Sequence, residues 1–133
     1  INGINTFNIS IIFALLFRNN DISLLKRKLF EHKVPSKISG SSCFLLTLKN
    51  DIKNLNKLES LYKDKIRYHV DNETIIEFAN LYNFNDNYLK AFIIYKPTVD
   101  AIELMNQGLK GAELGSEIRR REIEKFKKLL WNI

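Results

Sequence analysis

Residues 107–121 read QGLKGAELGSEIRRR, which combines glycines with a helical pattern of apolar residues. Gly108 directly follows a short apolar helical segment, a position where glycine commonly ends a helix. From about Gly111 to Leu130, apolar residues again recur at every third or fourth position, which predicts a long final helix. The stretch therefore predicts two helices joined by a glycine turn.

The same helical spacing extends upstream, and strand-like alternation over more than four residues is hard to find. The residues SKISGSS (36–42) are predicted to form a turn before a helix that begins at about Ser42. Other helices are predicted to begin after side chains that can cap them, namely Asn20 or Asp21, Asp71 or Asn72, Asp86 and Thr98. We therefore expect an all-α fold, an irregular array of about eight short helices with no significant sheet.

Length and composition suit one helical domain over residues 1–133, because 133 residues is an ordinary domain size and 45% of them are hydrophobic. The single Cys43 excludes an internal disulfide framework and fits a reducing compartment, so we expect a cytoplasmic protein. The apolar run ISIIFALLF (9–17) is about half of the ~20 residues that span a bilayer, so no membrane association is expected.

The net charge of +6 is carried by the first half of the chain. Residues 1–66 contain 11 Lys and Arg against 5 Asp and Glu, whereas residues 67–133 contain 10 of each class. Lysine and arginine displace condensed counterions from nucleic acid, so this asymmetry suits a surface that faces RNA phosphates. A codon bias toward Lys, Asn and Ile is the alternative explanation.

Residues that could perform chemistry are sparse. His32 and His69 lie far apart, and neither has a companion at metal-ligand spacing. No phosphate-binding loop, dinucleotide fingerprint or nucleophile elbow occurs. We therefore expect no catalytic residue, no metal site and no cofactor within this segment.

The two faces of the final helix predict different contacts. Gly111 and Gly115 share its apolar side with Leu114 and Ile118. Glycine inside a helix costs about 1 kcal/mol relative to alanine, so two on one face predict close approach by a neighbouring helix. The opposite face is charged, carrying Glu117, Arg120, Arg121, Glu124, Lys127 and Lys128. These residues can pair with one another at a spacing of four, or they can contact RNA phosphates.

A longer pattern spans DAIELMNQGLKGAELGSEIRRREIEKFKKLLW (100–131). It resembles the C-terminal end of class II bacterial CCA-adding tRNA nucleotidyltransferases and their poly(A) polymerase relatives. In that family a helix is followed by a G-[FL]-x-G turn, two spaced apolar residues and a basic run. The matching positions here are Gly108, Leu109, Gly111, Leu114, Ile118 and Arg119–Arg121.

Two upstream segments also resemble this family, although more faintly. KRKLFEHKVPSKIS (26–39) is similar to the RLKVP segment of members that carry an HD domain. FALLFRNND (13–21) stands where those members have ALLHDLGK, with Phe17 and Arg18 in place of the His-Asp pair. The resemblance therefore implies that the metal-dependent phosphohydrolase site is missing.

The resemblance implies that this chain is a C-terminal fragment of a larger protein, with a body (1–97) and a tail (98–133) that hold tRNA. The parent would be a nucleotidyltransferase whose catalytic head, using Mg²⁺ and nucleoside triphosphates, lies N-terminal to this segment. CCA addition and poly(A) synthesis both remain open. The candidate RNA contacts are Lys26, Arg27, Lys28, Lys110, Arg119, Arg120, Arg121, Lys127 and Lys128.

Two alternatives to the family resemblance are open. Gly108-Leu109-Lys110-Gly111 fits the G-x-x-G loop of KH domains, but a KH domain also needs strands that this sequence does not predict. The chain could instead be a helical protein-interaction domain that binds a protein partner or a second copy of itself and no RNA.

Overall fold

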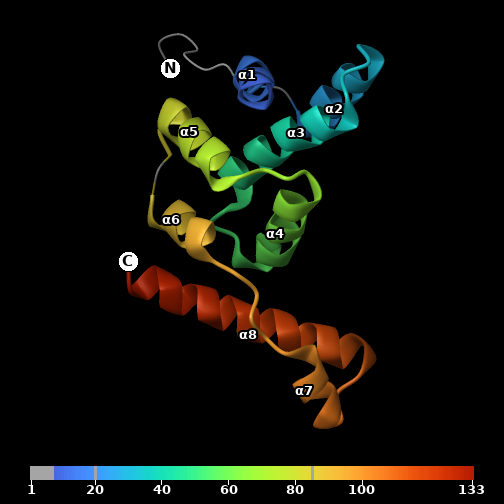
Figure 1. The fold of residues 1–133 in the computed structure, drawn as a ribbon, viewed down its shortest axis with the longest axis vertical. Helices are drawn as coiled ribbons and strands as arrows, with labels where there is room; N and C mark the ends of the chain where they lie inside the picture. Colours follow the sequence, from blue (N-terminus) through green and yellow to red (C-terminus); the bar gives the residue numbers. More distant parts are fainter. Residues whose placement is uncertain (1–7, 20, 85) are drawn as a thin grey trace. The chain divides into compact units, whose positions relative to one another are not determined.

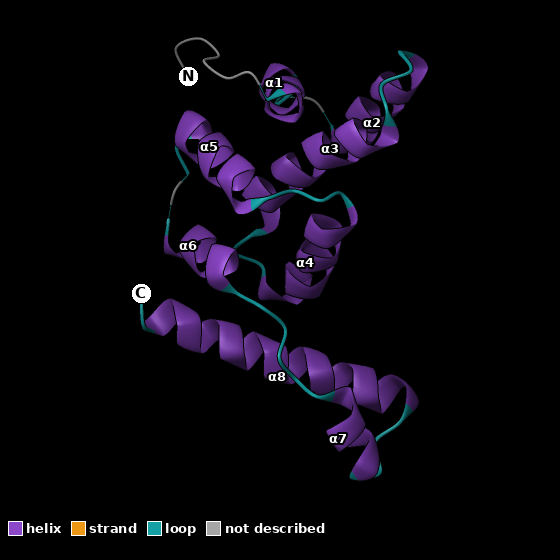
Figure 2. Ribbon diagram, in the orientation of Figure 1, coloured by secondary structure: helices purple, strands orange, loops and turns teal. Residues whose placement is uncertain are grey.

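The computed structural model describes residues 8–19, 21–84 and 86–133. Within these ranges the chain forms helices and no strand, so the predicted all-α fold is confirmed (Figures 1 and 2). The elements are α1 (Ile9–Leu16), α2 (Ile22–Glu31), α3 (Ser36–Asp51), the 3-10 helix η1 (Leu55–Lys57), α4 (Leu58–Arg67), α5 (Asn72–Tyr82), α6 (Asn87–Ile94), α7 (Ala101–Asn106) and α8 (Gly111–Trp131).

The helices form two compact units, Ile1–Asn85 and Asp86–Ile133, called here the N-terminal and the C-terminal unit. The first contains α1 to α5, and the second contains α6 to α8. The body and tail expected from the resemblance divide at residue 97. In the structure α6 packs on α8, so the segment from residue 86 onward groups with the tail.

Helix α3 is the centre of the N-terminal unit, because α1, α2, α4 and α5 all contact it. Its second half begins with an apolar run in which the side chains of Leu45 and Leu48 are fully buried. Its first half contains four small residues that are also buried, Ser39 to Ser42. The Ser42 hydroxyl donates a hydrogen bond of 2.8 Å to the Ser10 carbonyl of α1. Burial of this helix on several sides therefore organises the unit.

The predicted turn at residues 36–42 is wrong, because α3 begins at Ser36 and runs through this stretch. Serine and glycine are poor helix formers, but tertiary packing overrides such preferences. A Cβ atom added at Gly40 would overlap the Tyr68 ring, so the missing side chain lets that ring lie against the helix. The Ser41 hydroxyl also donates to the Lys37 carbonyl at 2.9 Å, which keeps this polar group satisfied inside the helix.

Aspartate caps confirm three of the predicted helix starts. Asp21, Asp71 and Asp86 accept hydrogen bonds from backbone N–H groups in the first turns of α2, α5 and α6, at 2.7, 2.8 and 3.0 Å. Hydrogen bonds from Thr74 lower the pKa of Asp71. The alternative cap Asn20 lies outside the described residues. Local side-chain chemistry therefore sets these boundaries.

The predicted cap at Thr98 is wrong, because Asp100 caps α7 by accepting from the N–H groups of Ile102 and Glu103. The N–H of Thr98 instead donates to Glu122 Oε1 at 3.0 Å. Glu122 also accepts from the Val99 N–H at 2.8 Å and from the Tyr95 hydroxyl at 2.5 Å. This glutamate is only 7% exposed, and it joins the segment after α6 to α8 in the core of the C-terminal unit.

Gly108 ends α7 as predicted. Its φ of +96° is favourable only for glycine, and its N–H donates to the Met105 carbonyl at 3.0 Å. The N–H of Leu109 donates to the Leu104 carbonyl at 3.2 Å. These two bonds form a Schellman motif, which satisfies carbonyls at the helix end.

The close helix approach predicted at Gly111 and Gly115 is wrong. A Cβ atom at Gly111 would have no other atom within 4 Å, and Gly111 is needed because its φ is +62°. At Gly115 the nearest atom to an added Cβ would be Nη1 of Arg119, 3.4 Å away on the same helix. Among the glycines of the described ranges, Gly40 is the one that permits a close approach, in a segment where the sequence indicated a turn.

Candidate nucleic-acid interface

The predicted RNA-binding residues fall in both units, with three cations on α2 and six on or directly before α8. Eight of the nine are exposed, and Arg121 is partly buried. Exposure makes contact with a polyanion geometrically possible. The availability of each charge depends on its neighbours.

Two arginines of α8 are already engaged with carboxylates of the same helix. Glu117 Oε1 lies 2.6 Å from Arg120 Nη2 and 2.8 Å from Arg121 Nε. Arg120 Nη1 also lies 2.7 Å from Glu124 Oε1. Hydrogen bonds from Arg120 and, to a lesser extent, from Arg121 lower the pKa of Glu117 to about 2. The expected pairing of this helix face is therefore confirmed for these residues.

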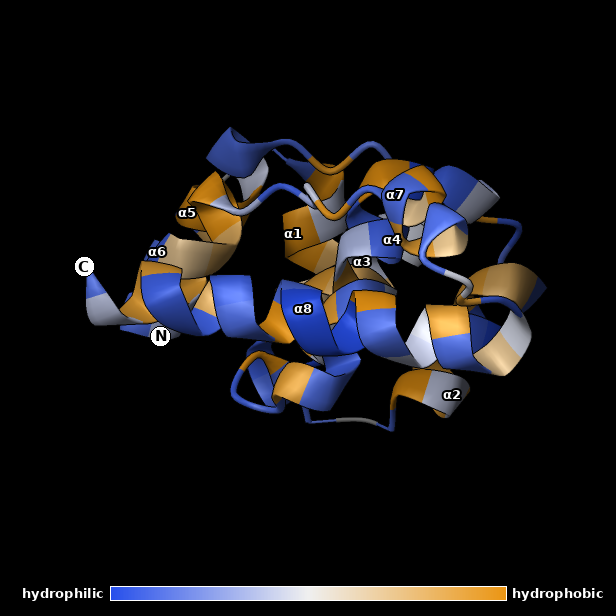
Figure 3. Cartoon of the chain, turned by 90° about the horizontal axis from the view of Figure 1, so that it is seen from below, coloured by the Kyte–Doolittle hydropathy of each residue, from blue (hydrophilic) through white to orange (hydrophobic). Residues whose placement is uncertain are grey.

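Other cations of the C-terminal unit are less constrained. Lys110, Lys127 and Lys128 are exposed and form no ion pair with a described residue, so the expected Glu124–Lys128 pair is absent from that part of the chain. Arg119 donates a long 3.4 Å hydrogen bond to the Ser116 hydroxyl. In Figure 3 the ribbon of α8 is coloured hydrophilic along much of its middle. Acidic and basic residues are mixed there, as at Glu117, Arg120 and Glu124, so the charged face does not form an uninterrupted basic stripe.

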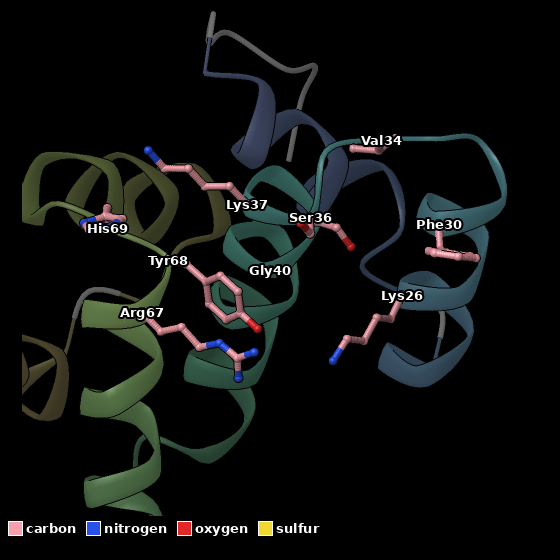
Figure 4. Close-up of a pocket in the computed structure, with 10 residues that line it drawn as sticks. Lys26, Phe30, Val34, Ser36, Lys37, Gly40, Arg67, Tyr68 and His69 are labelled. Carbon is pink, nitrogen blue, oxygen red and sulfur yellow. The ribbon is translucent and has the colours of Figure 1, made fainter.

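The three cations of α2 differ in their surroundings. Arg27 Nε lies 3.9 Å from Glu31 Oε1 in an exposed pair, and Lys28 faces solvent. Lys26 instead lines a pocket between α2, the start of α3 and the end of α4, which we call the α2–α4 pocket (Figure 4). Its volume is about 500 Å³, within the usual range for small-molecule sites.

Positive charge dominates the α2–α4 pocket. Lys26, Lys37 and Arg67 line it together with His69, and no lining residue is acidic. None of the three permanent cations forms an ion pair with any residue in the described ranges. The Arg67 guanidinium lies 5.3 Å from the Tyr68 ring centroid, which orients it by a cation–π contact. The pocket is therefore an electropositive recess suited to an anion.

Lys26 also lies near the buried thiol of Cys43. Burial raises the pKa of Cys43, and the Lys26 charge acts in the opposite direction. Because the thiol therefore stays neutral near pH 7, it does not neutralise the Lys26 ammonium.

A hydroxyl group completes the polar lining. Ser39 is 7% exposed, and its side chain makes no hydrogen bond to another described residue. No fully buried side-chain nitrogen or oxygen in that part of the chain lacks a partner, so the Ser39 hydroxyl must reach open space. Ser39 is one of the residues that line the pocket. Its hydroxyl is therefore a candidate hydrogen-bond donor to a ligand bound there.

Aromatic side chains lie on two sides of the pocket. Phe30 on α2 is 82% exposed, and Tyr68 follows the last residue of α4 (Figure 4). The Tyr68 ring packs against Gly40, whereas most of the surface of Phe30 is exposed to solvent. A cationic recess with an exposed aromatic ring is a combination typical of single-stranded nucleic-acid binding.

Sequence reasoning identified Lys26 and missed the other main pocket residues, Phe30, Ser39, Arg67 and Tyr68. Phe30 could have been found, because it lies off the buried face formed by Leu25 and Leu29 and is surrounded by basic residues. The remaining residues are brought together only by packing of α2 and α4 on α3.

No family model, curated protein or solved structure matches this chain. The resemblance to CCA-adding enzymes therefore remains a prediction from the residues quoted for it. Over the described ranges, no helix combines the length and apolar character needed to cross a membrane. The same ranges contain no group of three His, Cys, Asp or Glu side chains arranged to hold a metal ion.

Proposed function

We propose that this chain is the RNA-binding body and tail of a tRNA nucleotidyltransferase-like protein, which positions tRNA for a catalytic head outside this segment. The head would use Mg²⁺ and nucleoside triphosphates, as the family resemblance implies. The observation that carries the proposal is the α2–α4 pocket, where Lys26 and Arg67, two cations without carboxylate partners, point toward the same space, while Lys37 lines the pocket but points away from them (Figure 4).

Phosphate contacts explain this arrangement better than solubility does. Like charges in one recess repel one another, and a fold gains nothing from gathering them unless an anion neutralises them. RNA supplies such anions at regular spacing, and neutralisation releases condensed counterions. These contacts position the RNA backbone without reading its bases. The lysines of α8 would extend the same type of contact along the tail.

A protein-interaction domain is the second candidate, and the C-terminal unit supplies the observation that favours it. The arginines of α8 are paired within the helix. Several apolar side chains of the unit are exposed, with Ile102 at 65%, Met105 at 50% and Trp131 at 90%. Such residues are common at interfaces.

The test is tRNA binding measured by fluorescence anisotropy at several salt concentrations. We expect the logarithm of the association constant to fall steeply and linearly with the logarithm of salt concentration. The K26E/R67E double variant should weaken binding by about tenfold or more, because it reverses two phosphate contacts. R120E/K127E should weaken binding less, because Glu117 and Glu124 already neutralise Arg120.

The matched control is K57E, which reverses an exposed lysine beside the N-terminal end of α4, away from the pocket. It should change affinity much less than either pocket substitution. Absent binding, or binding independent of salt, would overturn the RNA proposal and favour the protein-interaction domain.

A further inference from the structure

We infer that the α2–α4 pocket binds one unpaired nucleotide, with its phosphate between Lys26 and Arg67 and its base against Phe30. This inference deepens the proposed function, and it rests on that function if the bound nucleotide is part of an RNA. The experiments below test the nucleotide pocket and RNA binding separately, because they use free nucleotides as well as RNA.

The positive charge of the pocket indicates that the ligand carries a phosphate group. Lys26 reaches in from α2 and Arg67 from the end of α4, with the first turns of α3 between them (Figure 4). An arginine guanidinium matches phosphate oxygens through parallel N–H donors, and a lysine adds a compact charge. The Ser39 hydroxyl is the nearly buried donor that still lacks a partner among the described residues. These groups together suit a phosphate ester.

The exposed ring of Phe30 indicates that the ligand also carries a base. Phe30 exposes 82% of its surface at the edge of a cationic pocket, a costly place for a large apolar ring in water. A nucleobase stacked on it would remove apolar surface from both partners, and such stacking typically contributes about 1–3 kcal/mol per base. The ligand therefore carries a flat aromatic group beside its phosphate.

The size and shape of the pocket exclude a duplex. A recess of about 500 Å³ accommodates a ligand of nucleotide size, and it lies between helices of one unit. In an RNA duplex the base faces are covered by their neighbours, so only an unpaired or terminal base can reach Phe30.

The lining also sets how selective the pocket is. Phe30 and Val34 offer apolar contacts on the side of α2 and the turn that follows it. Neither side chain has a hydrogen-bond donor or acceptor with which to distinguish base edges. The pocket should therefore bind purine and pyrimidine nucleotides with similar affinity, and purines somewhat better because they stack more strongly.

The test uses two-dimensional amide NMR spectra of the full chain, titrated with adenosine 5′-monophosphate, uridine 5′-monophosphate, ribose 5-phosphate and inorganic phosphate. We expect both nucleotides to shift amides at the start of α3 and around Tyr68. Their affinity should exceed that of ribose 5-phosphate at least fivefold. Equal affinity for ribose 5-phosphate and the nucleotides, or no shifts at these amides, would overturn the inference.

Substitutions locate each half of the ligand. F30L should reduce nucleotide affinity to the level of ribose 5-phosphate and leave ribose 5-phosphate binding unchanged. S39A should weaken all phosphate-bearing probes. The matched control W131L removes another highly exposed aromatic ring, in the other unit, and should change nothing. If F30L and W131L bind nucleotides equally well, the base does not contact Phe30 and the inference fails.

A final comparison separates free nucleotides from RNA. A 5′-phosphorylated single-stranded trinucleotide and a blunt RNA hairpin are added to the same titration. Stronger binding of the trinucleotide supports an unpaired nucleotide within RNA. Binding of the mononucleotides without either RNA supports the pocket as a nucleotide site and overturns the proposed function. Salt-dependent tRNA binding that F30L leaves intact, without mononucleotide shifts, supports the proposed function and overturns this inference.

Discussion

At the scale of single residues, Gly40 and Gly115 show that the same residue type is required in one helix and dispensable in another. Gly40 faces the Tyr68 ring, so an added methyl group must displace a packed ring. Gly115 faces only the end of the flexible Arg119 side chain, at 3.4 Å from an added Cβ. The two positions therefore form a matched pair for one substitution.

We predict opposite effects of alanine at these positions on the free energy of unfolding. G40A should destabilise the protein by about 1–3 kcal/mol, the usual cost of overpacking. G115A should stabilise it by up to about 1 kcal/mol, because alanine has the higher helix propensity. Urea unfolding monitored by circular dichroism measures both. A stabilising G40A would show that the Tyr68 ring is not held against α3.

Residue-level prediction from the sequence succeeded where the partner is local. Asp21, Asp71 and Asp86 cap groups two or three residues away, so their role follows from sequence position. Glu122 was missed because its partners lie 23 to 27 residues away. On the helix surface it is flanked by charged residues that resemble it, and nothing in the sequence marks it as buried.

At the scale of elements, α8 shows how one carboxylate can make the stability of a helix depend on pH. Glu117 accepts hydrogen bonds from Arg120 and Arg121, which lower its pKa from 4.5 to about 2. The folded state therefore releases this proton more readily than the unfolded chain does. The stabilising contribution is present above about pH 4.5 and is lost as the pH falls toward about 2.

We predict that E117Q lowers the melting temperature of the protein at pH 6 and that the difference from the native sequence disappears near pH 2. Glutamine is the matched substitution because it removes the charge and keeps the shape. Thermal unfolding followed by circular dichroism across this range provides the measurement. A difference that stays constant with pH would show that the Glu117 charge does not stabilise α8.

Helix boundaries could be predicted where a local residue, such as a glycine stop, sets them. The prediction failed where packing against other helices sets the boundary. The glycine stop at Gly108 and the start of α8 near Gly111 followed from the sequence. The start of α3 did not, because its small residues are typical of turns and become helical only when neighbouring elements cover them. Small residues in a buried helix and small residues in a turn give the same local pattern.

At the scale of the whole molecule, the division into two units separates the two groups of candidate cations. The helices that build the α2–α4 pocket all belong to the N-terminal unit. The core of that unit is formed by α3 and the four helices that contact it. Binding at the pocket should therefore depend on residues 1–85.

We predict that residues 1–85, produced alone, retain helical circular dichroism and bind adenosine 5′-monophosphate as tightly as the full chain does. Residues 86–133 should show no such binding, because none of the pocket residues lies there. Isothermal titration calorimetry compares the two fragments. Loss of binding by a folded 1–85 fragment would show that the C-terminal unit takes part in the site.

The pocket itself was beyond sequence reasoning because its charges come from three separate elements. Lys26, Lys37 and Arg67 lie on α2, α3 and α4, and only their packing makes one recess. The charge asymmetry of residues 1–66 did indicate the half of the chain that contains most of this pocket. Composition can locate a basic region, but the convergence of side chains depends on the fold.

The hydrogen bonds of Glu122 have a consequence for the order of events during synthesis on the ribosome. Their donors, from Tyr95 to Val99, emerge 23 to 27 residues before the carboxylate that accepts from them. In a nascent chain that ends before residue 122, these donors have no carboxylate to bind, even if α6 and α7 have already formed. The C-terminal unit can therefore close only after much of α8 has left the exit tunnel, whereas the helices around α3 are complete long before.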